Sequence, residues 1–419
     1  MSTVETQRTL DAVWRIESPK LIAGLSRIVR DVGVAEELVQ DAFVSALVQW
    51  PESGIPRNPG AWLMAVAKRR AIDRFRREDV VELKHQEIAR EIQLHETGEP
   101  DVDALDDDIG DDLLRLIFIA CHPVLSTEAR IALTLRLLGG LSTSDIARAF
   151  LVAEPVVAQR IVRAKRTLSE AHIPFEVPNA SERAARLSSV LGVLYLIFNE
   201  GYAASAGDDV LRPALCEDAL WLGRVLAQLV PDDSEVHALV ALMEIQASRS
   251  TARVNASGEP ILLLDQDRGR WDQLLIRRGL AALERAEALG GALGPYAFQA
   301  AIAACHARAH TAEQTDWTRI AALYDALAQV LPSPVVQLNR AVAVGMAYGA
   351  AAGLELVDAL RSEPSLKAYH LLSSVRGDLL EKLSRFGEAQ TEFEHAAELA
   401  HNVRDRTLMR ERAARCAHR

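Results

Sequence analysis

Basic and amide side chains recur at helical spacing in one short segment of the chain. Gln159, Arg163 and Arg166 fall three or four residues apart, so they share one face of a helix, flanked by Arg160 and Lys165. Guanidinium and amide groups are the side chains that most often contact phosphates and base edges in DNA. The opposite face is apolar and predicts the packed side of this helix: Val157, Ile161, Ala164 and Leu168. The pattern therefore predicts a helix that binds nucleic acid.

A second helix is predicted immediately before this one. Ser142 is a typical capping residue, and Asp145, three residues later, completes a variant of the capping box. Residues 151–154 then turn the chain, and Pro155 suits the first position of the basic helix. Two short helices joined by a turn, the second of them basic, form a helix-turn-helix that fits the major groove of DNA.

Another basic segment lies nearer the N-terminus. Residues 57–77 contain seven basic side chains and a single acid, Asp73. The segment reads as a helix that starts near Ala61 after a loop rich in proline and glycine. Its buried stripe is predicted at steps of four: Leu63, Ala67, Ala71 and Phe75. A chain with two unlike basic helices is expected to contact two unlike stretches of DNA.

Two further segments flank the basic helix of residues 61–77. Residues 36–50 form an amphipathic helix, with Glu37, Gln40 and Asp41 on its polar side. Its apolar side is expected to hold Leu38, Ala42, Val44, Leu47 and Val48. Residues 96–112 contain nine acids and no base, which is typical of a solvated linker.

Composition narrows the class of protein. With 419 residues, 49% hydrophobic and 25% charged, the chain is expected to fold into two or three domains. Apolar residues recur at spacings of three and four residues rather than two, which predicts an all-α protein without a sheet. We find no segment that could span a membrane and no signal peptide, so a cytoplasmic protein without membrane contact is expected.

The cysteines give no indication of a metal or redox centre. The chain has four, and none forms a C-x-x-C pair. Cys121 and Cys305 each precede a histidine, but adjacent residues do not share a helical face, which favours core packing over a metal site. We expect reduced thiols, no metal and no cofactor.

Residues 10–172 resemble an extracytoplasmic-function sigma factor, the smallest class of bacterial RNA polymerase specificity subunits. The segment 36–44 is similar to the region 2 helix that docks on the polymerase clamp, and 62–77 to the helix that faces the opened minus-ten element. The segment 142–168 resembles the region 4 helix-turn-helix for the minus-thirty-five element. The resemblance implies region 2 at 10–78, an acidic linker at 79–112 and region 4 at 113–172.

The resemblance also implies partners and site residues. The partners are the bacterial RNA polymerase core and promoter DNA, and no catalytic residue is needed because nucleotide chemistry belongs to the polymerase. The polymerase contacts are Glu37, Leu38, Gln40 and Asp41. The minus-ten contacts are Trp62, Lys68, Arg69, Arg70, Asp73, Arg74, Arg76 and Arg77. At the minus-thirty-five element, base edges are expected to be read by Gln159, Val162 and Arg163, and the backbone held by Arg160, Lys165 and Arg166.

One position departs from the family pattern. Where members commonly carry Arg-Asn, this chain has Lys68-Arg69. An amide that could hydrogen-bond a base edge is thereby replaced by a guanidinium, which contacts phosphate or stacks on a base. The preference at the downstream element is therefore expected to differ.

Residues 181–419 form a helical extension with a weak repeat. Tyr324, Val357 and Phe393 occupy equivalent second-helix positions, near the ~34-residue period of tetratricopeptide repeats. Gly377, with the alanines around Phe393, predicts closely packed helices, and residues 402–415 suit a polar capping helix. The arrangement resembles sigma factors with a tetratricopeptide-like extension, which implies a regulatory domain that binds a protein or peptide partner.

Two alternatives remain open from the residues alone. The chain could be a helix-turn-helix regulator whose repeat domain senses a partner. The carboxylates of Asp265, Asp267 and Asp272 could instead belong to a hydrolytic or metal site, although a hydrogen-bonded turn and helix cap explain them more simply.

Overall fold

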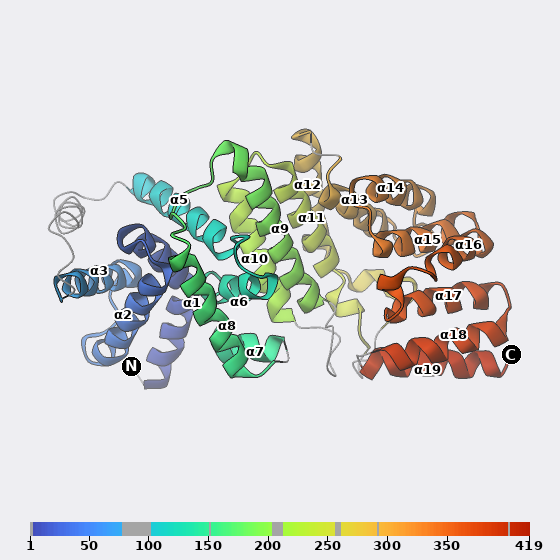
Figure 1. Ribbon diagram of the computed structural model, residues 1–419, viewed down its shortest axis with the longest axis horizontal. Coiled ribbons are helices and arrows are strands. Elements are labelled where there is room, and N and C mark those ends of the chain that lie inside the picture. Colours follow the sequence, from blue (N-terminus) through green and yellow to red (C-terminus); the bar gives the residue numbers. More distant parts are fainter. Residues whose placement is uncertain are drawn as a thin grey trace. The chain divides into compact units, whose positions relative to one another are not determined.

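Every regular element of the described residues is a helix, which confirms the all-α prediction (Figure 1). The chain divides into two compact units, residues 1–194 and 195–419. No helix in the part of the chain described has the length and apolar character of a membrane span. The computed structural model describes residues 3–77, 102–150, 152–202, 213–255, 261–290, 293–400 and 403–419.

The first unit begins with a bundle of three helices. Helix α1 packs on both α2 and α3, and α2 also packs on α3. Asp31 caps α2 by accepting a hydrogen bond from the Val34 amide at 3.0 Å. The predicted stripe from Leu63 to Phe75 is buried, and Trp50 closes the end of the core. The bounds are α1 (Thr3–Val29), α2 (Val32–Ser53) and α3 (Pro59–Arg77).

The helix-turn-helix follows the local sequence signals closely. The Ser142 hydroxyl accepts from the Asp145 amide at 3.1 Å, and the Asp145 carboxylate accepts from the Ser142 amide at 3.2 Å. Pro155 stands in the first turn of α8, whose predicted apolar stripe is buried. Ser126 caps α6 by accepting a hydrogen bond from the Ala129 amide. The bounds are α5 (Val102–Ala120), α6 (Thr127–Leu137), α7 (Thr143–Ala149) and α8 (Glu154–Glu170).

The boundaries around region 4 differ from those expected. Helix α5 already begins at Val102, within the predicted linker, because acidic residues in the first turns of a helix are favoured by its dipole. The rest of that linker, up to residue 101, lies outside the described residues. After α8, the first half of α9 (Ala180–Tyr202) belongs to the first unit.

Two hydrogen bonds explain why α9 begins as part of the first unit. Arg186 donates to the Phe118 carbonyl at 3.0 Å, and Ser189 donates to the Cys121 carbonyl at 2.8 Å. Both carbonyls lie at the C-terminal end of α5, where a helix leaves its carbonyls without internal partners. The second compact unit therefore begins at residue 195, inside α9.

The second unit is a series of antiparallel helix pairs (Figure 1). Helices α10 to α12 come first, followed by the pairs α13–α14, α15–α16 and α17–α18, and then α19. The first three are α10 (Pro213–Leu229), α11 (Ser234–Ala247) and α12 (Gln273–Ala288), with short turns η1 (Ser250–Ala252), η2 (Leu263–Asp265) and η3 (Arg268–Arg270) between the last two. The others are α13 (Pro295–Arg308), α14 (Trp317–Val330), α15 (Pro334–Tyr348), α16 (Ala350–Leu360), η4 (Pro364–Leu366), α17 (His370–Lys382), α18 (Phe386–Leu399) and α19 (Val403–Ala417).

The predicted repeat positions fall where expected. Tyr324, Val357 and Phe393 lie in α14, α16 and α18, the second helices of successive pairs. A side chain on Gly377 would lie 2.7 Å from the Phe393 ring, so only glycine lets α17 and α18 approach this closely. The small-residue pattern thus serves helix packing.

Helix α19 caps the series, in agreement with the prediction. Arg412 is buried and donates to Asp378 at 2.8 Å and to Glu381 at 2.7 Å, both on α17. Its guanidinium also stands 4.3 Å from the centre of the Phe393 ring. One arginine therefore joins α19 to both helices of the preceding pair.

The acidic segment near residue 270 is structural. Asp267 accepts from the Gly269 amide at 2.9 Å, and Asp272 accepts from the Leu274 and Leu275 amides at the start of α12. These carboxylates thus form the predicted turn and helix cap. The four cysteines are buried and free of disulfides.

Candidate nucleic-acid interface

The outward face of α8 presents the residues predicted to contact DNA. Gln159, Val162, Arg163 and Arg166 are exposed, and Val162 retains 65% of its accessible surface. Arg166 pairs with Glu170 one turn later at 3.3 Å, and both side chains are exposed. Such pairs contribute only about 0 to 1 kcal/mol, so the guanidinium can change partner readily. Arg160 is half-buried at the edge of this face.

Lys165 is placed differently from the exposed residues of α8. Its ammonium pairs with Glu36, a carboxylate on α2 that is almost fully buried. Glu36 also accepts from Arg136 of α6 at 2.7 Å and from Gln40 at 2.6 Å. In this conformation Lys165 therefore neutralises a buried acid of α2. No sequence pattern indicates this pairing, because the partners are more than a hundred residues apart.

A second contact joins the same two parts of the first unit. The Trp14 indole on α1 donates to the Gly140 carbonyl at 2.8 Å, in the turn before α7. Its ring also packs edge-on against Phe43, with 4.8 Å between the ring centres. The three-helix bundle and the helix-turn-helix are thus held together by two separate contacts, one at Glu36 and one at Trp14.

The basic face of α3 and the acidic face of α2 form one surface. Arg70 pairs with Asp41 at 2.9 Å and also donates to Ser45, while Arg74 pairs with Glu37 at 3.1 Å. In the sequence analysis the acids are expected to contact the polymerase and the arginines to contact DNA. The structure brings them together as a ladder of exposed ion pairs, which we call the α2–α3 ladder.

The other predicted residues of α3 are placed as follows. Arg69 and Asp73 are exposed, and Lys68 is half-buried. Trp62 packs edge-on against buried Trp50, with 5.4 Å between the ring centres. Arg76 and Arg77 lie in the last turn of α3, but their side chains are outside the described part. The exposed and half-buried members leave a basic strip beside the tryptophan.

The apolar side predicted for α2 divides into two. Leu38 is only 4% exposed and Ala42 is buried, so Leu38 belongs to the bundle core and not to an accessible partner surface. Val44, Leu47 and Val48 are exposed instead, and Val48 retains 69% of its surface. At about 100° per residue, Val44 and Val48 point away from the fully buried Val39 and Ala46, and Leu47 lies between the two sides. A helical wheel drawn over all of α2 would have separated the buried from the exposed apolar residues.

Comparison with known proteins separates the three-helix bundle from the helix-turn-helix in the same way as the structure does. Residues 14–80 match the family described as Sigma-70 region 2, and residues 115–168 match Sigma-70, region 4. Residues 186–287 match a family of unknown function, DUF6596. The first match contains the α2–α3 ladder, and the second contains α8.

Two relatives are informative. The uncharacterized protein R00370 of Rhizobium meliloti is 43% identical over 394 residues, which cover 94% of this chain and 92% of that protein. The probable ECF RNA polymerase sigma factor SigI of Mycobacterium tuberculosis is 30% identical over 176 residues, 42% of this chain and 59% of that protein. No solved structure matches the chain.

The buried carboxylate supports a prediction about Glu36→Gln. Removing its charge leaves Arg136 and Lys165 without a counter-charge at a largely buried contact, which we expect to cost about 2 to 4 kcal/mol. Hydrogen exchange of the α2, α6 and α8 amides measures this as a lower opening free energy. The neighbouring Glu37→Gln, whose pair is exposed, should change it by less than about 0.5 kcal/mol. Equal effects of the two variants would show that the Glu36 cluster does not hold the contact.

Proposed function

This chain belongs to the extracytoplasmic-function RNA polymerase sigma factors and carries a C-terminal extension, and we propose from this how its surfaces divide promoter recognition. The observation that carries the proposal is the presence of two dissimilar, exposed basic helices, α3 and α8, in two separately matched parts of one chain. A dimeric repressor needs only one such helix per half-site. Two unlike helices suit two unlike promoter elements.

On α8, exposure and chemistry together divide the roles. Gln159, Val162 and Arg163 are proposed to reach base edges in the major groove of the minus-thirty-five element. Arg160 and Arg166 are proposed to hold phosphates. Lys165 is proposed to act as a structural anchor through Glu36.

The minus-ten element is proposed to lie along α3. Opening a duplex requires single-stranded bases to be held by stacking and edge hydrogen bonds, and Trp62 with the loop before α3 supplies a candidate platform. Lys68, Arg69, Arg70 and Arg74, continuing to Arg76 and Arg77, would neutralise phosphates. Asp73, exposed within this strip, would disfavour phosphate and so mark where a base lies.

The polymerase core is proposed to bind the exposed side of α2. Glu37, Gln40 and Asp41 provide its polar part, and the apolar part is moved from Leu38 to Val44, Leu47 and Val48. Apolar contacts ringed by charges are the usual composition of an interface centre and rim. Core binding would compete for the acids of the α2–α3 ladder and release its arginines for DNA.

The extension is proposed to regulate initiation within the same chain and to bind a protein or peptide partner. Paired helices beyond residue 194 exceed what promoter recognition requires, and arrays of this kind offer extended surfaces to peptides. We propose that the protein acts in the cytoplasm, where the polymerase is found. No catalytic role is assigned to it, because nucleotide chemistry resides in the polymerase.

Transcription by bacterial core polymerase tests the α8 roles directly. Arg163→Ala is expected to weaken use of the upstream element by about 1 to 3 kcal/mol and to change the preferred base, because it removes an edge contact. Arg166→Ala should weaken all promoter variants about equally. Identical base preferences for the two variants would refute the division into reading and holding residues. Failure of the parent protein to start transcripts with core would instead favour a regulator that binds closed duplex.

The polymerase contact is tested with Val48→Arg. A charge at the centre of an apolar contact should weaken core binding at least about tenfold in a pull-down titration, while circular dichroism stays unchanged because the site is exposed. Val124→Arg, at an exposed valine in region 4, is the matched control and should bind normally. Equal binding by both variants would show that the polymerase core contacts another part of the protein. Leu38→Arg is unsuitable, since it would disrupt the bundle core.

Regulation by the extension is tested at α19. A chain ending at residue 402 and the Arg412→Ala variant should both loosen α17 and α18 in hydrogen exchange and lose promoter-dependent transcription, since Arg412 joins α19 to that pair. Arg415→Ala, at an exposed position of the same helix, should leave both properties unchanged. A chain ending at residue 202 keeps α9 and should bind core but initiate abnormally. Unchanged transcription from both truncations would contradict control by the extension.

A further inference from the structure

A cavity of about 230 Å³ lies inside the second unit, between α11, α13, α14 and α15. Its polar lining includes Gln246, Arg249 and His306, with Tyr195 and Gln299 joined by a hydrogen bond of 3.0 Å. Leu242 and Ile302 contribute apolar surface. None of the side chains described around it is acidic. The cavity therefore combines one cation, several polar groups and an apolar wall.

Three buried polar atoms on this lining have no hydrogen-bond partner among the described residues: Gln246 Oε1, Arg249 Nε and His306 Nδ1. His306 is only 7% exposed. Leaving a buried polar group unsatisfied costs about 1 to 3 kcal/mol, so native structures contain few of them. Three around one cavity indicate a site shaped for a polar ligand.

The local charge is positive. Arg268 stands near Arg249, and its hydrogen bonds within the described residues go to neutral acceptors, the His306 and Ala309 carbonyls at 2.8 Å and the Thr315 hydroxyl at 2.8 Å. The acid near Arg268 is Glu313, which is exposed and does not line the cavity. Burial, together with Arg249 and Arg268, lowers the pKa of His306 to about 3, so the imidazole is neutral. Arg249 itself lies 5.7 Å from the centre of the Trp271 ring. The lining thus offers one available guanidinium for a single negative charge.

We propose that this cavity binds a small monocarboxylic acid bearing a hydroxyl group. Its carboxylate would accept hydrogen bonds from Arg249, and its second group would donate to Gln246 Oε1. The volume lies below the ~300 to 1,000 Å³ of most sites for drug-sized ligands, which suits a metabolite of few atoms. A doubly charged phosphate fits less well, because His306 is neutral and adds no second cation.

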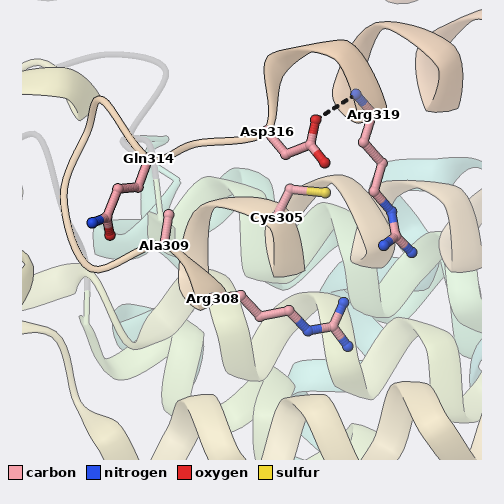
Figure 2. A pocket seen from close by; sticks show the side chains of 6 residues that line it. All are labelled: Cys305, Arg308, Ala309, Gln314, Asp316 and Arg319. Atoms are coloured by element: carbon pink, nitrogen blue, oxygen red, sulfur yellow. Dashed lines mark hydrogen bonds between the residues drawn. The ribbon is translucent and has the colours of Figure 1, made fainter.

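A second hollow nearby lacks the features that favour an anionic ligand (Figure 2). Cys305, next to His306 in sequence, lines a space of about 260 Å³ with Arg308, Asp316 and Arg319. Its arginines are exposed, and Asp316 already supplies a negative charge while capping α14 through the Arg319 amide at 2.9 Å. Burial raises the pKa of the Cys305 thiol, which leaves it protonated. This hollow serves as the matched control.

A ligand in the cavity would join two parts of the extension. Gln246 and Arg249 belong to the part that matches the family of unknown function, whereas His306 and Tyr324 belong to the helix pairs that follow it. Occupancy would fix α11 against α13 and α14. The inference concerns binding alone and does not rest on the proposed role in transcription.

Saturation-transfer NMR on the full chain tests the proposal with lactate, glycolate and glycerate as probes and with propionate as the comparison. Inorganic phosphate, which has no carbon-bound protons to observe, is added as a competitor against bound lactate. We expect saturable binding of at least one hydroxy acid in the millimolar range or tighter. Propionate, which has one charge but lacks the hydroxyl, should bind about tenfold more weakly or worse, and phosphate should displace lactate only at about tenfold higher concentration or more. Gln246→Glu places a carboxylate beside Arg249, so it should abolish binding while the melting temperature stays equal or rises. Arg308→Gln, in the neighbouring hollow, should bind as the parent does.

Three outcomes would overturn the proposal. The first is the absence of a saturable response to lactate, glycolate and glycerate. The second is equal binding of propionate, or displacement of lactate by phosphate at equal concentration, which would remove the requirement for a hydroxyl donor or for a single charge. The third is undiminished binding by Gln246→Glu, which would place the ligand outside this cavity. Because Gln246→Glu supplies Arg249 with a partner, lost binding in a variant with an unchanged melting temperature reports the site itself.

Discussion

The carboxylate of Glu36 is the constraint on which the first unit depends. Removing an ionised carboxylate from water costs several kcal/mol unless cations and hydrogen bonds replace the water. Here Gln40 on the same helix supplies a hydrogen bond, and Arg136 and Lys165 supply the charge. Those cations come from the helix-turn-helix, so the bundle can bury Glu36 at low cost only when region 4 is docked. Region 2 and region 4 are therefore energetically coupled.

In the second unit the equivalent constraint is the close packing of α17 on α18, which is completed by the buried charge of Arg412. Gly377 lets α17 approach Phe393, and Arg412 then covers that ring while pairing with Asp378 and Glu381. Burial by itself raises the pKa of Asp378, but hydrogen bonds from Lys382 and Arg412 outweigh it and hold the pKa below its ordinary value. This contribution to stability is present above the unfolded-state pKa and is lost as the pH falls through the folded-state value. The capping helix is thus held more firmly at neutral pH than at acid pH.

The sequence predicted what is decided locally. The Ser142–Asp145 capping box and Pro155 at the start of α8 depend on residues within a turn or two, and both are confirmed. The second-helix positions of Tyr324 and Phe393 follow from a repeat along the sequence and are confirmed as well. Pairings between distant residues were not predictable in this way. Lys165 looked like one more basic side chain of a DNA-facing helix, because nothing near it in sequence reveals Glu36. The cavity around Arg249 was missed for the same reason, since its lining comes from helices that only the fold brings together.

The two kinds of ion pair in the first unit differ in how easily they can be exchanged. Pairs of the α2–α3 ladder are exposed, contribute at most about 1 kcal/mol each and can pass to a partner's charges with little loss. The Glu36 cluster is buried, and separating it exposes a carboxylate and two cations that must be solvated again. Partners that bind the ladder can therefore engage region 2 while region 4 stays docked. Freeing Lys165 therefore needs a larger binding energy than exchanging a pair of the ladder. On the proposed division of surfaces, burial makes ladder exchange the expected first step and separation of the two regions the second.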